Sequence, residues 1–361
     1  MSRPLTSLCL LAVVTAAFAQ TATRPPAPPT LGLENGLASF DTPQFSVKLV
    51  KASQTLAALN PRADTRFDFT PADRLNVRAS DGFYQFGDIN FRVRVGDGEW
   101  RSFSTALNRK PVIPLSAHSP DLARADLAPS LPADCPIQVV RAWTVRNGKL
   151  VLLFEVTNKT DHPIEIGHLG IPLIFNNIIT GRRLPEAHEK NSFSDPYIGI
   201  DAGYVQVTRL RGTGPSLVVI PEGKTPFEAY QPLAEPTRPQ QTAEGMFEWT
   251  VRSKALAEKD WAKAEPWNPP TSEILPPKGR REIGLRFLLS DSIRSIEDTH
   301  KANRRPVAVG IPGYVIPNDT EGKLFLNAPA NVAGISVEPA AAMTVKPIKS
   351  PSSKWQAFAI K

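Results

Sequence analysis

The chain has 361 residues, of which 41% are hydrophobic and 21% are charged, and its formal net charge at pH 7 is +7. A chain of this length can bury one large hydrophobic core or two smaller ones, so its stability does not require disulfides or a structural metal. Basic and acidic residues are mixed along the chain without a block of lysine and arginine, which argues against nucleic acid as a partner.

The N-terminus has the features of a secretory signal peptide. Arg3 precedes an apolar stretch from Leu5 to Phe18, and residues 17–19 read Ala-Phe-Ala, which fits the small residues that signal peptidase requires. We therefore expect residues 1–19 to be a signal peptide, residues 20–30 to be a proline-rich linker, and the protein to be secreted and extracellular. No later segment approaches the ~20 apolar residues of a membrane-spanning helix, so no membrane span is expected.

Secretion determines which disulfides and which glycosylation sites are expected. Removal of the signal peptide leaves Cys135 as the sole cysteine, so no internal disulfide is expected, and a buried, unreactive thiol is the favoured interpretation. Asn158 and Asn318 each begin an Asn-x-Thr sequon and are expected to be glycosylation acceptors in surface loops.

Strand patterns begin at residue 45. Apolar residues alternate with polar ones in 45–49, and Ile89, Phe91, Val93 and Val95 form one apolar face in 88–95. This period of two is typical of an antiparallel strand with one face in water. Asn147-Gly148, between two long apolar runs, predicts a tight hairpin because both residues readily adopt positive φ angles. Further strands are expected in 164–175, 215–222 and 280–290.

Two helices are expected, in 253–265 after the capping Ser253 and in 292–304 before Pro306. The predicted fold is therefore mainly β. A large antiparallel two-sheet sandwich should span 31–324, and an incomplete small β domain should follow in 325–361. Residues 335–361 are expected to be only loosely docked, because a few strands alone rarely hold together in water.

Several long stretches resemble a known family. "LGIPLIFNNIITGR", "DPYIGIDAGYVQVTRL" and "RPVAVGIPGYVIP" resemble the N-terminal region of an uncharacterised family of large secreted fungal and bacterial proteins. The resemblance implies a galactose-mutarotase-like β-supersandwich, then a small β domain, then an α/α toroid of the six-hairpin glycosidase type. In that architecture the toroid usually carries the catalytic carboxylates, and we expect this chain to lack it. The resemblance thus implies the N-terminal part of a glycoside hydrolase, and we expect this part not to be catalytic alone.

Residues 175–204 hold the densest cluster of reactive side chains and are expected to form a long loop that lines a groove. Sugar hydroxyls need paired hydrogen-bond donors and acceptors, and the C–H faces of sugars suit aromatic rings. The expected binding residues for a polysaccharide or oligosaccharide are Asn176, Asn177, Arg182, Asp195 and Tyr197. The alternative, that these residues only satisfy one another and the backbone, remains open.

Catalysis of glycosidic-bond cleavage needs two carboxyl groups ~5 to 9.5 Å apart, and Glu186 and Asp195 are the candidates in this stretch. A turn-capping role for Asp195 before Pro196 is the alternative. Mutarotases use a histidine acid, but His168, beside Gly167 in a strand, is better explained as a core or face residue. No nucleophile elbow, His-Glu-x-x-His or phosphate-binding loop is present, so no metal site and no cofactor are expected.

Trp267 lies among prolines and presents a rigidly held aromatic ring, which suits either a sugar platform or packing against a neighbouring domain. The family architecture favours packing. The leading hypothesis for function is a secreted, carbohydrate-associated β-sandwich module. The alternatives are a self-sufficient carbohydrate-active enzyme, an epimerase or hydrolase that uses the loop carboxylates, and a structural interaction module at the cell surface.

Overall fold

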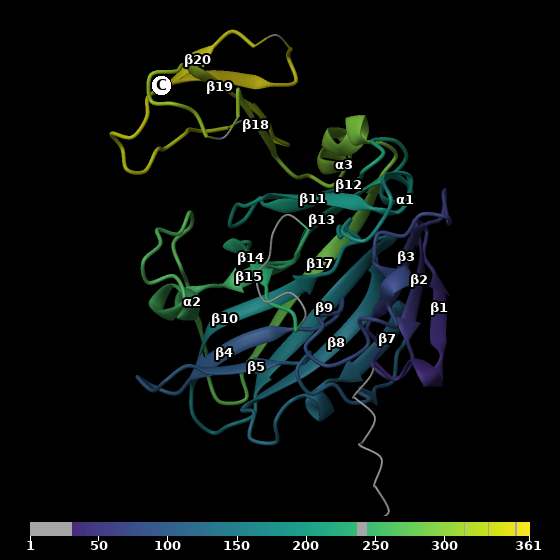
Figure 1. Ribbon diagram of the computed structural model, residues 1–361. Helices are drawn as coiled ribbons and strands as arrows, with labels where there is room; N and C mark the ends of the chain where they lie inside the picture. Colours follow the sequence, from purple (N-terminus) through teal and green to yellow (C-terminus); the bar gives the residue numbers. More distant parts are fainter. Residues whose placement is uncertain (1–30, 237–243, 314, 331, 351) are drawn as a thin grey trace, which may run out of the picture.

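The computed structural model describes residues 31–236, 244–313, 315–330, 332–350 and 352–361. The expected signal peptide (1–19) and linker (20–30) lie outside the described residues. The described chain is mainly β, with antiparallel sheets and short helices (Figure 1). The predicted fold class is confirmed.

The largest sheet has eight strands in the order β11-β12-β13-β17-β9-β8-β7-β6. Its strands are β6 (Ile113–Pro114), β7 (Asp121–Asp126), β8 (Ile137–Arg146), β9 (Lys149–Asn158), β11 (Ser192–Tyr197), β12 (Tyr204–Arg209), β13 (Ser216–Glu222) and β17 (Arg280–Ser290). The β8–β9 hairpin turns at Asn147 and Gly148, whose φ angles are 52° and 70°. The hairpin predicted from this dipeptide is confirmed.

The second sheet has six strands, with the order β14-β15-β10-β4-β5 and with β16 also paired to β10. Its strands are β4 (Asn90–Arg94), β5 (Arg101–Ser104), β10 (Ile164–Leu173), β14 (Ala229–Leu233), β15 (Met246–Arg252) and β16 (Glu273–Leu275). A three-stranded sheet of β1 (Leu37–Asp41), β2 (Phe45–Val50) and β3 (Leu56–Pro61) lies at one side of the sandwich (Figure 1).

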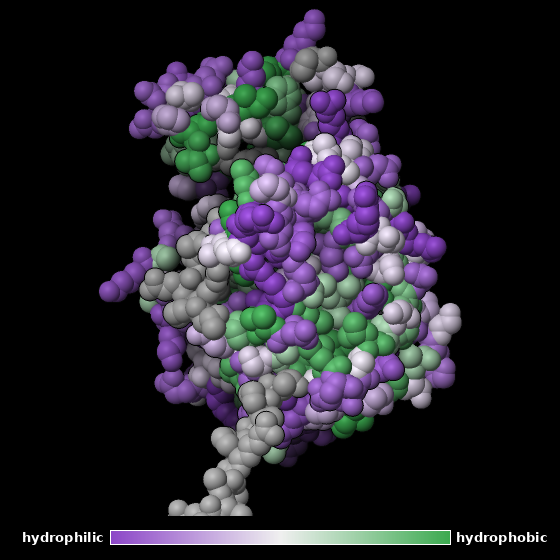
Figure 2. All heavy atoms as spheres, turned by 45° about the vertical axis from the view of Figure 1, so that its right-hand side comes forward, coloured by the Kyte–Doolittle hydropathy of each residue, from purple (hydrophilic) through white to green (hydrophobic). Residues whose placement is uncertain are grey.

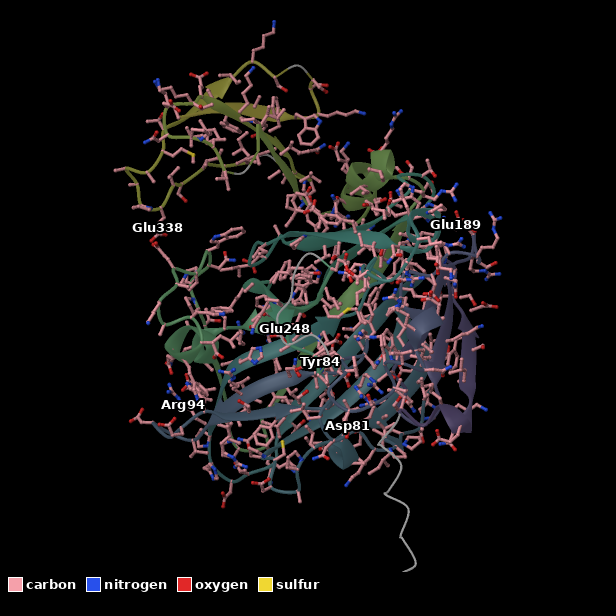
Figure 3. All side chains as sticks on the ribbon, in the orientation of Figure 1. Asp81, Tyr84, Arg94, Glu189, Glu248 and Glu338 are labelled. Atoms are coloured by element: carbon pink, nitrogen blue, oxygen red, sulfur yellow. The ribbon has the colours of Figure 1, made fainter. Side chains whose placement is uncertain are left out.

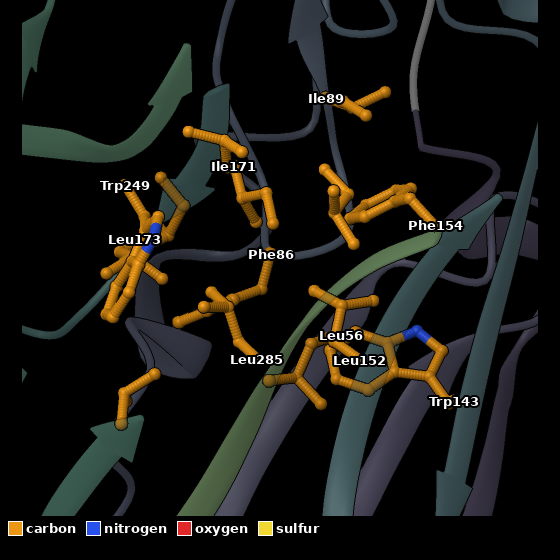
Figure 4. Packing of buried hydrophobic residues seen from close by; sticks show 14 of the residues in the cluster. Leu56, Phe86, Ile89, Trp143, Leu152, Phe154, Ile171, Leu173, Trp249 and Leu285 are labelled. Carbon is orange, nitrogen blue, oxygen red and sulfur yellow. The ribbon is translucent and has the colours of Figure 1, made fainter. Parts of the chain in front are cut away.

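The main core fills the space between the six-stranded and eight-stranded sheets (Figure 4). Ile171 and Trp249 contribute from the six-stranded sheet and Phe154 and Leu285 from the eight-stranded sheet, and each is 0% exposed. Burial of apolar surface contributes about 25 cal/mol per Å², so this layer is the main source of stability. The expected two-sheet sandwich is present.

A four-stranded sheet stands at one end of the sandwich, in the order β18-β19-β21-β20 (Figure 1). Its strands are β18 (Val307–Ile311), β19 (Gly322–Asn327), β20 (Val345–Ile348) and β21 (Gln356–Ile360). The sheet takes β18 and the start of β19 from residues that the predicted boundary assigned to the sandwich. Among its described strand residues, the buried apolar side chains are Val307, Ala357 and Ile360. It therefore has little core of its own.

The described α-helices are α1 (Leu184–Lys190), α2 (Lys254–Lys259) and α3 (Ile296–Ala302), and the 3-10 helices are η1 (Leu33–Asn35), η2 (Ala72–Arg74), η3 (Ala128–Ser130) and η4 (Ile293–Ser295). α2 and α3 lie inside the two predicted helical ranges and are shorter. α1 corrects the expectation of a loop there: Pro185 occupies its first turn, and Glu186 bonds Arg182 and Lys190 at i,i+4 spacing, which favours a helix. No helix in the described ranges is long and apolar enough to cross a membrane.

Asn158 is fully buried at the end of β9, which corrects its assignment as a surface acceptor for a glycan. Its Nδ2 donates to the carbonyl oxygens of His162, Leu275 and Pro276 at 2.8 to 3.1 Å, and its Oδ1 accepts from Thr160. A glycan on Nδ2 requires space that this site lacks. Asn318 is exposed, and its glycosylation stays a prediction.

β4 offers a test of the strand register. Val93 is 2% exposed in the core, whereas Val95, predicted on the same buried face, is 51% exposed because the strand ends at Arg94. Val93→Asp buries an unpaired charge and is expected to lower the free energy of unfolding by several kcal/mol. The matched Val95→Asp variant should stay within about 1 kcal/mol of the parent. Urea unfolding measures both, and equal losses would show the register to be wrong.

Candidate functional site

A groove of about 850 Å³ lies between the outer face of the eight-stranded sheet and the four-stranded sheet. We call it the inter-sheet groove. One wall comes from β11, β12 and their connection, the other comes from β18 and β19, and Trp267 also lines it. In the space-filling view a constriction separates the two bodies, and hydrophobic side chains lie on the small body near it (Figure 2).

A tight connection between β11 and β12 builds the first wall. The Gly203 amide donates to the Gly199 carbonyl at 2.8 Å, and a Cβ at Gly203 would lie 2.6 Å from that same oxygen, closer than atoms can pack. This close approach lets Tyr197 and Tyr204 pair across the strands, with their rings stacked at 4.5 Å. Tyr204 in turn rests on His300 of α3, at 4.0 Å between ring centres. Burial lowers the pKa of His300 to about 4, so the ring behind this wall is neutral.

Asp195 and Tyr197 are on the same face of β11 and share one amide neighbour. Gln206 Nε2 lies 3.2 Å from Asp195 Oδ2 and 3.3 Å from the Tyr197 hydroxyl. The amide therefore holds a carboxylate and a phenol side by side at the groove. Among the described residues that line the groove, Asp195 alone carries a formal charge.

Asn327 supplies an unused hydrogen-bond donor on the opposite wall. It is 6% exposed, it lines the groove, and its Nδ2 has no partner in the described part of the chain. A buried donor left unsatisfied costs about 1–3 kcal/mol, and such groups in native proteins call for an explanation. The Nδ2 atom itself is shielded from solvent, so the Asn327 side chain must turn towards the groove before a ligand that accepts a hydrogen bond recovers that cost.

Trp267 is held at the groove by a braced loop. It is 84% exposed and sits between α2 and β16. Lys254 Nζ, at the start of α2, and Ser272 Oγ, at the end of the loop, both donate to Glu165 Oε1, at 2.7 and 2.6 Å. Glu228 makes a second brace, because it accepts from Ser253 Oγ at 2.6 Å and from Thr271 on the other side.

Three of the predicted ligand-binding residues are internal to the fold, which corrects their assignment. Asn176 Nδ2 donates to the Lys190 carbonyl and Asn177 Nδ2 to the Gly245 carbonyl, and both side chains are buried. The Arg182 guanidinium, 3% exposed, bonds Asp73 at 2.7 Å and Glu186 at 3.0 Å. Asn177 Oδ1 and Arg182 Nε have no partner among the described residues, but all three side chains are buried and none of them lines the groove. Asp195 and Tyr197 do line the groove.

The two candidate catalytic carboxylates belong to different settings. Glu186 sits on α1, where the hydrogen bond from Lys190, with that from Arg182, holds its pKa below the usual range. That direction opposes a role as a proton donor. Asp195 faces the groove from β11 and bonds Gln206. The structure does not join Glu186 and Asp195 into an acid–base pair.

A second polar cluster, not anticipated from the sequence except for His168, lies on the six-stranded sheet (Figure 3). His168 Nε2 is 2.6 Å from Glu248 Oε1, and Asn90 Nδ2 donates to Glu248 Oε2 at 2.9 Å. Gly170 makes room, since a Cβ there would lie 2.3 Å from that carboxylate. Burial, together with Glu248, raises the pKa of Tyr84 to about 12.

This cluster has the groups of an acid–base pair, an imidazole hydrogen-bonded to a carboxylate. The two side chains are 8% and 1% exposed, however, so the pair as it stands fastens β10 to β15, in line with the face position expected for His168. Among the described residues no group of three or more His, Cys, Asp or Glu side chains is placed to hold a metal.

The sequence matches the model of a family of unknown function, DUF5695, over residues 48–361. The chain belongs to this family. Among curated proteins, none matches the sequence. The family match agrees with the resemblance, seen in the sequence, to a family whose chemistry is not established.

Solved structures similar to the chain include a polysaccharide lyase, at 11% identity and a TM-score of 0.60, over 88% of this chain and 42% of the lyase. This protein therefore spans about two fifths of the lyase's length and shares its fold in that region. A galactose mutarotase-like protein from Lactobacillus casei is similar at 9% identity and a TM-score of 0.41, over 70% of this chain and 100% of that one. A 4-alpha-glucanotransferase from Thermococcus litoralis is similar at 8% identity and a TM-score of 0.35, over 71% of this chain and 39% of that one.

Sequence reasoning missed Tyr204 and Asn327. Tyr204 had a signal, because Gly199 and Gly203 bracket a short connection that returns the chain beside Tyr197. Asn327 had none, since the residues that face it across the groove, on β11, β12 and their connection, are more than 100 residues away in the sequence.

The Glu165 brace gives a pH test. Burial alone would raise the pKa of Glu165, but hydrogen bonds from Lys254, Ser272 and Arg94 outweigh it and lower the pKa from 4.5 to about 2. A lowered carboxyl pKa stabilises the fold above the unfolded-state value and loses that contribution as pH falls from about 4.5 towards 2. Across this pH range the free energy of unfolding of the wild type should fall by up to about 3 kcal/mol more than that of Glu165→Gln.

Chemical denaturation at a series of pH values measures this difference. Glu99→Gln, at an exposed position, is the control and should follow the wild-type profile. Parallel profiles for wild type and Glu165→Gln would contradict the role of Glu165 as the brace of the Trp267 loop.

Proposed function

We propose that the protein is a secreted, carbohydrate-binding β-supersandwich module and that its inter-sheet groove holds a stretch of polysaccharide or oligosaccharide. The observation that carries the proposal is the meeting, in one groove, of aromatic rings with an unused donor and a carboxylate acceptor. The rings are those of Tyr197 and Trp267, the donor is Asn327 Nδ2, and the acceptor is Asp195.

The chemistry of this groove matches that of a sugar chain. Pyranose rings have apolar C–H faces, which pack on aromatic side chains, and hydroxyls that both donate and accept hydrogen bonds. Most other lining residues are apolar, among them Ile198, Val307 and Leu326. Binding pockets of this kind combine an apolar lining with a few polar groups that fix orientation.

Two further observations support the proposal. The fold is shared with a polysaccharide lyase, a protein whose name states that it acts on polysaccharide. Residues 1–19 have the pattern of a signal peptide with its cleavage site, which supports secretion. A secreted protein encounters extracellular glycans.

A self-sufficient enzyme using Glu186 and Asp195 has less support. Glu186 is committed to ion pairs with Arg182 and Lys190, and glycosidic chemistry requires a protonated acid close to a second carboxylate. We therefore assign Asp195 to binding.

Isothermal titration of the purified protein with sugars selected on a glycan array tests the proposal. Trp267→Ala and Tyr197→Ala are each expected to weaken binding roughly tenfold, which corresponds to about 1.4 kcal/mol of lost ring contact. Ile274→Ala is the control, because Ile274 is 66% exposed close to the same loop and is not one of the lining residues. If neither aromatic substitution weakens binding, the groove is not the binding site. If the protein binds no glycan at all, the result favours an interaction module.

A further inference from the structure

We propose that the inter-sheet groove selects neutral saccharide chains and rejects anionic ones, such as chains of uronic acids or sulfated sugars. The inference rests on the proposed function, because it concerns the ligand of the same groove. It follows from the distribution of charge around the groove.

The groove offers a lone negative charge. Asp195 is the sole formally charged side chain among the described lining residues. Its described hydrogen-bond partner is the neutral amide of Gln206, in contrast to Glu165, Glu186 and Glu228, which each have a lysine or arginine within 4.0 Å. The charge of Asp195 is therefore not neutralised by a neighbouring cation.

The Arg305 guanidinium, behind the first wall, keeps its charge but directs two of its hydrogen bonds at backbone carbonyls. Arg305 is absent from the lining, and its guanidinium donates to the carbonyl oxygens of Asp201 and Gly203 at 2.8 and 3.4 Å. His300, behind Tyr204, is neutral because burial lowers its pKa to about 4. Sites that bind carboxylate or sulfate groups use arginine forks or lysines that point at the ligand, and the described lining contains neither.

The electrostatic penalty for an anionic sugar is substantial. Two like charges about 5 Å apart repel with an energy that reduces affinity from severalfold in water-like surroundings to a hundredfold or more in a partly shielded groove. A neutral sugar avoids this penalty, and one of its hydroxyls donates to Asp195. After a rotation of the Asn327 side chain, its Nδ2, which is shielded and without a partner in the described part of the chain, donates to a sugar oxygen from the other wall.

The test compares a panel of neutral hexasaccharides, built from glucose, xylose, mannose or galactose, with hexagalacturonate of the same length. Titration at pH 7 and about 20 mM salt should give at least tenfold tighter binding for the best neutral chain. Asp195→Asn should narrow that ratio to within about threefold, as should 300 mM salt, which screens the repulsion. Asp134→Asn is the control, because Asp134 is 72% exposed and is not one of the lining residues; its ratio should stay that of the wild type.

Each other outcome counts against the inference. Hexagalacturonate that binds as tightly as the neutral chains, with an affinity that depends on Trp267, overturns the charge selection and leaves the proposed function standing. If Asp195→Asn leaves the ratio of neutral-chain affinity to hexagalacturonate affinity unchanged, the inference is also overturned. Failure of every chain to bind overturns both the inference and the proposed function.

Discussion

Strands β12, β13 and β17 carry apolar side chains on both faces, and the need to cover both faces organises the molecule. Their inner residues, such as Val219 and Phe287, belong to the core between the two large sheets. Their outer residues form a second apolar cluster of Tyr204, Val218, Ile220 and Leu288, which Ile296 of α3 covers. Exposure of this outer cluster would cost about 1.5–3 kcal/mol for each large side chain. α3 is therefore fixed on the outside of the sandwich, and the chain leaves it at the start of β18.

The inter-sheet groove is a consequence of that arrangement. α3 covers the outer face over β13 and β17 but leaves β11 and the connection to β12 uncovered, where Asp195 and Tyr197 project. The four-stranded sheet begins directly after α3, so Val307 and Asn327 are brought opposite these residues. The braced loop then adds Trp267. Three segments that are distant in sequence thus meet around one space.

Much of the fold was predictable because local patterns report it. The Asn147-Gly148 turn, the alternation through Val93 and the long apolar runs all identify strands correctly. The unbroken run Leu217–Pro221 also carried a signal of burial on both faces, which explains why an outer covering helix exists. The composition of residues 175–204 was less informative, because polar side chains there have two different roles. Asn176 and Asn177 donate hydrogen bonds to buried backbone carbonyls, whereas Asp195 lines the groove. The register of β11 with β12 places Asp195 on the groove side, and the sequence alone does not reveal that register.

The groove itself could not be predicted, because its polar groups come from separate elements and their meeting depends on long-range packing. The most direct test of the account is a crystal structure of the protein with a neutral hexasaccharide that titration shows to bind. The account predicts sugar rings against Trp267 and Tyr197, with hydrogen bonds from Asn327 Nδ2 and to Asp195. A bound sugar seated elsewhere, for example over Tyr84 and Glu248 on the six-stranded sheet, with the inter-sheet groove empty, would contradict it.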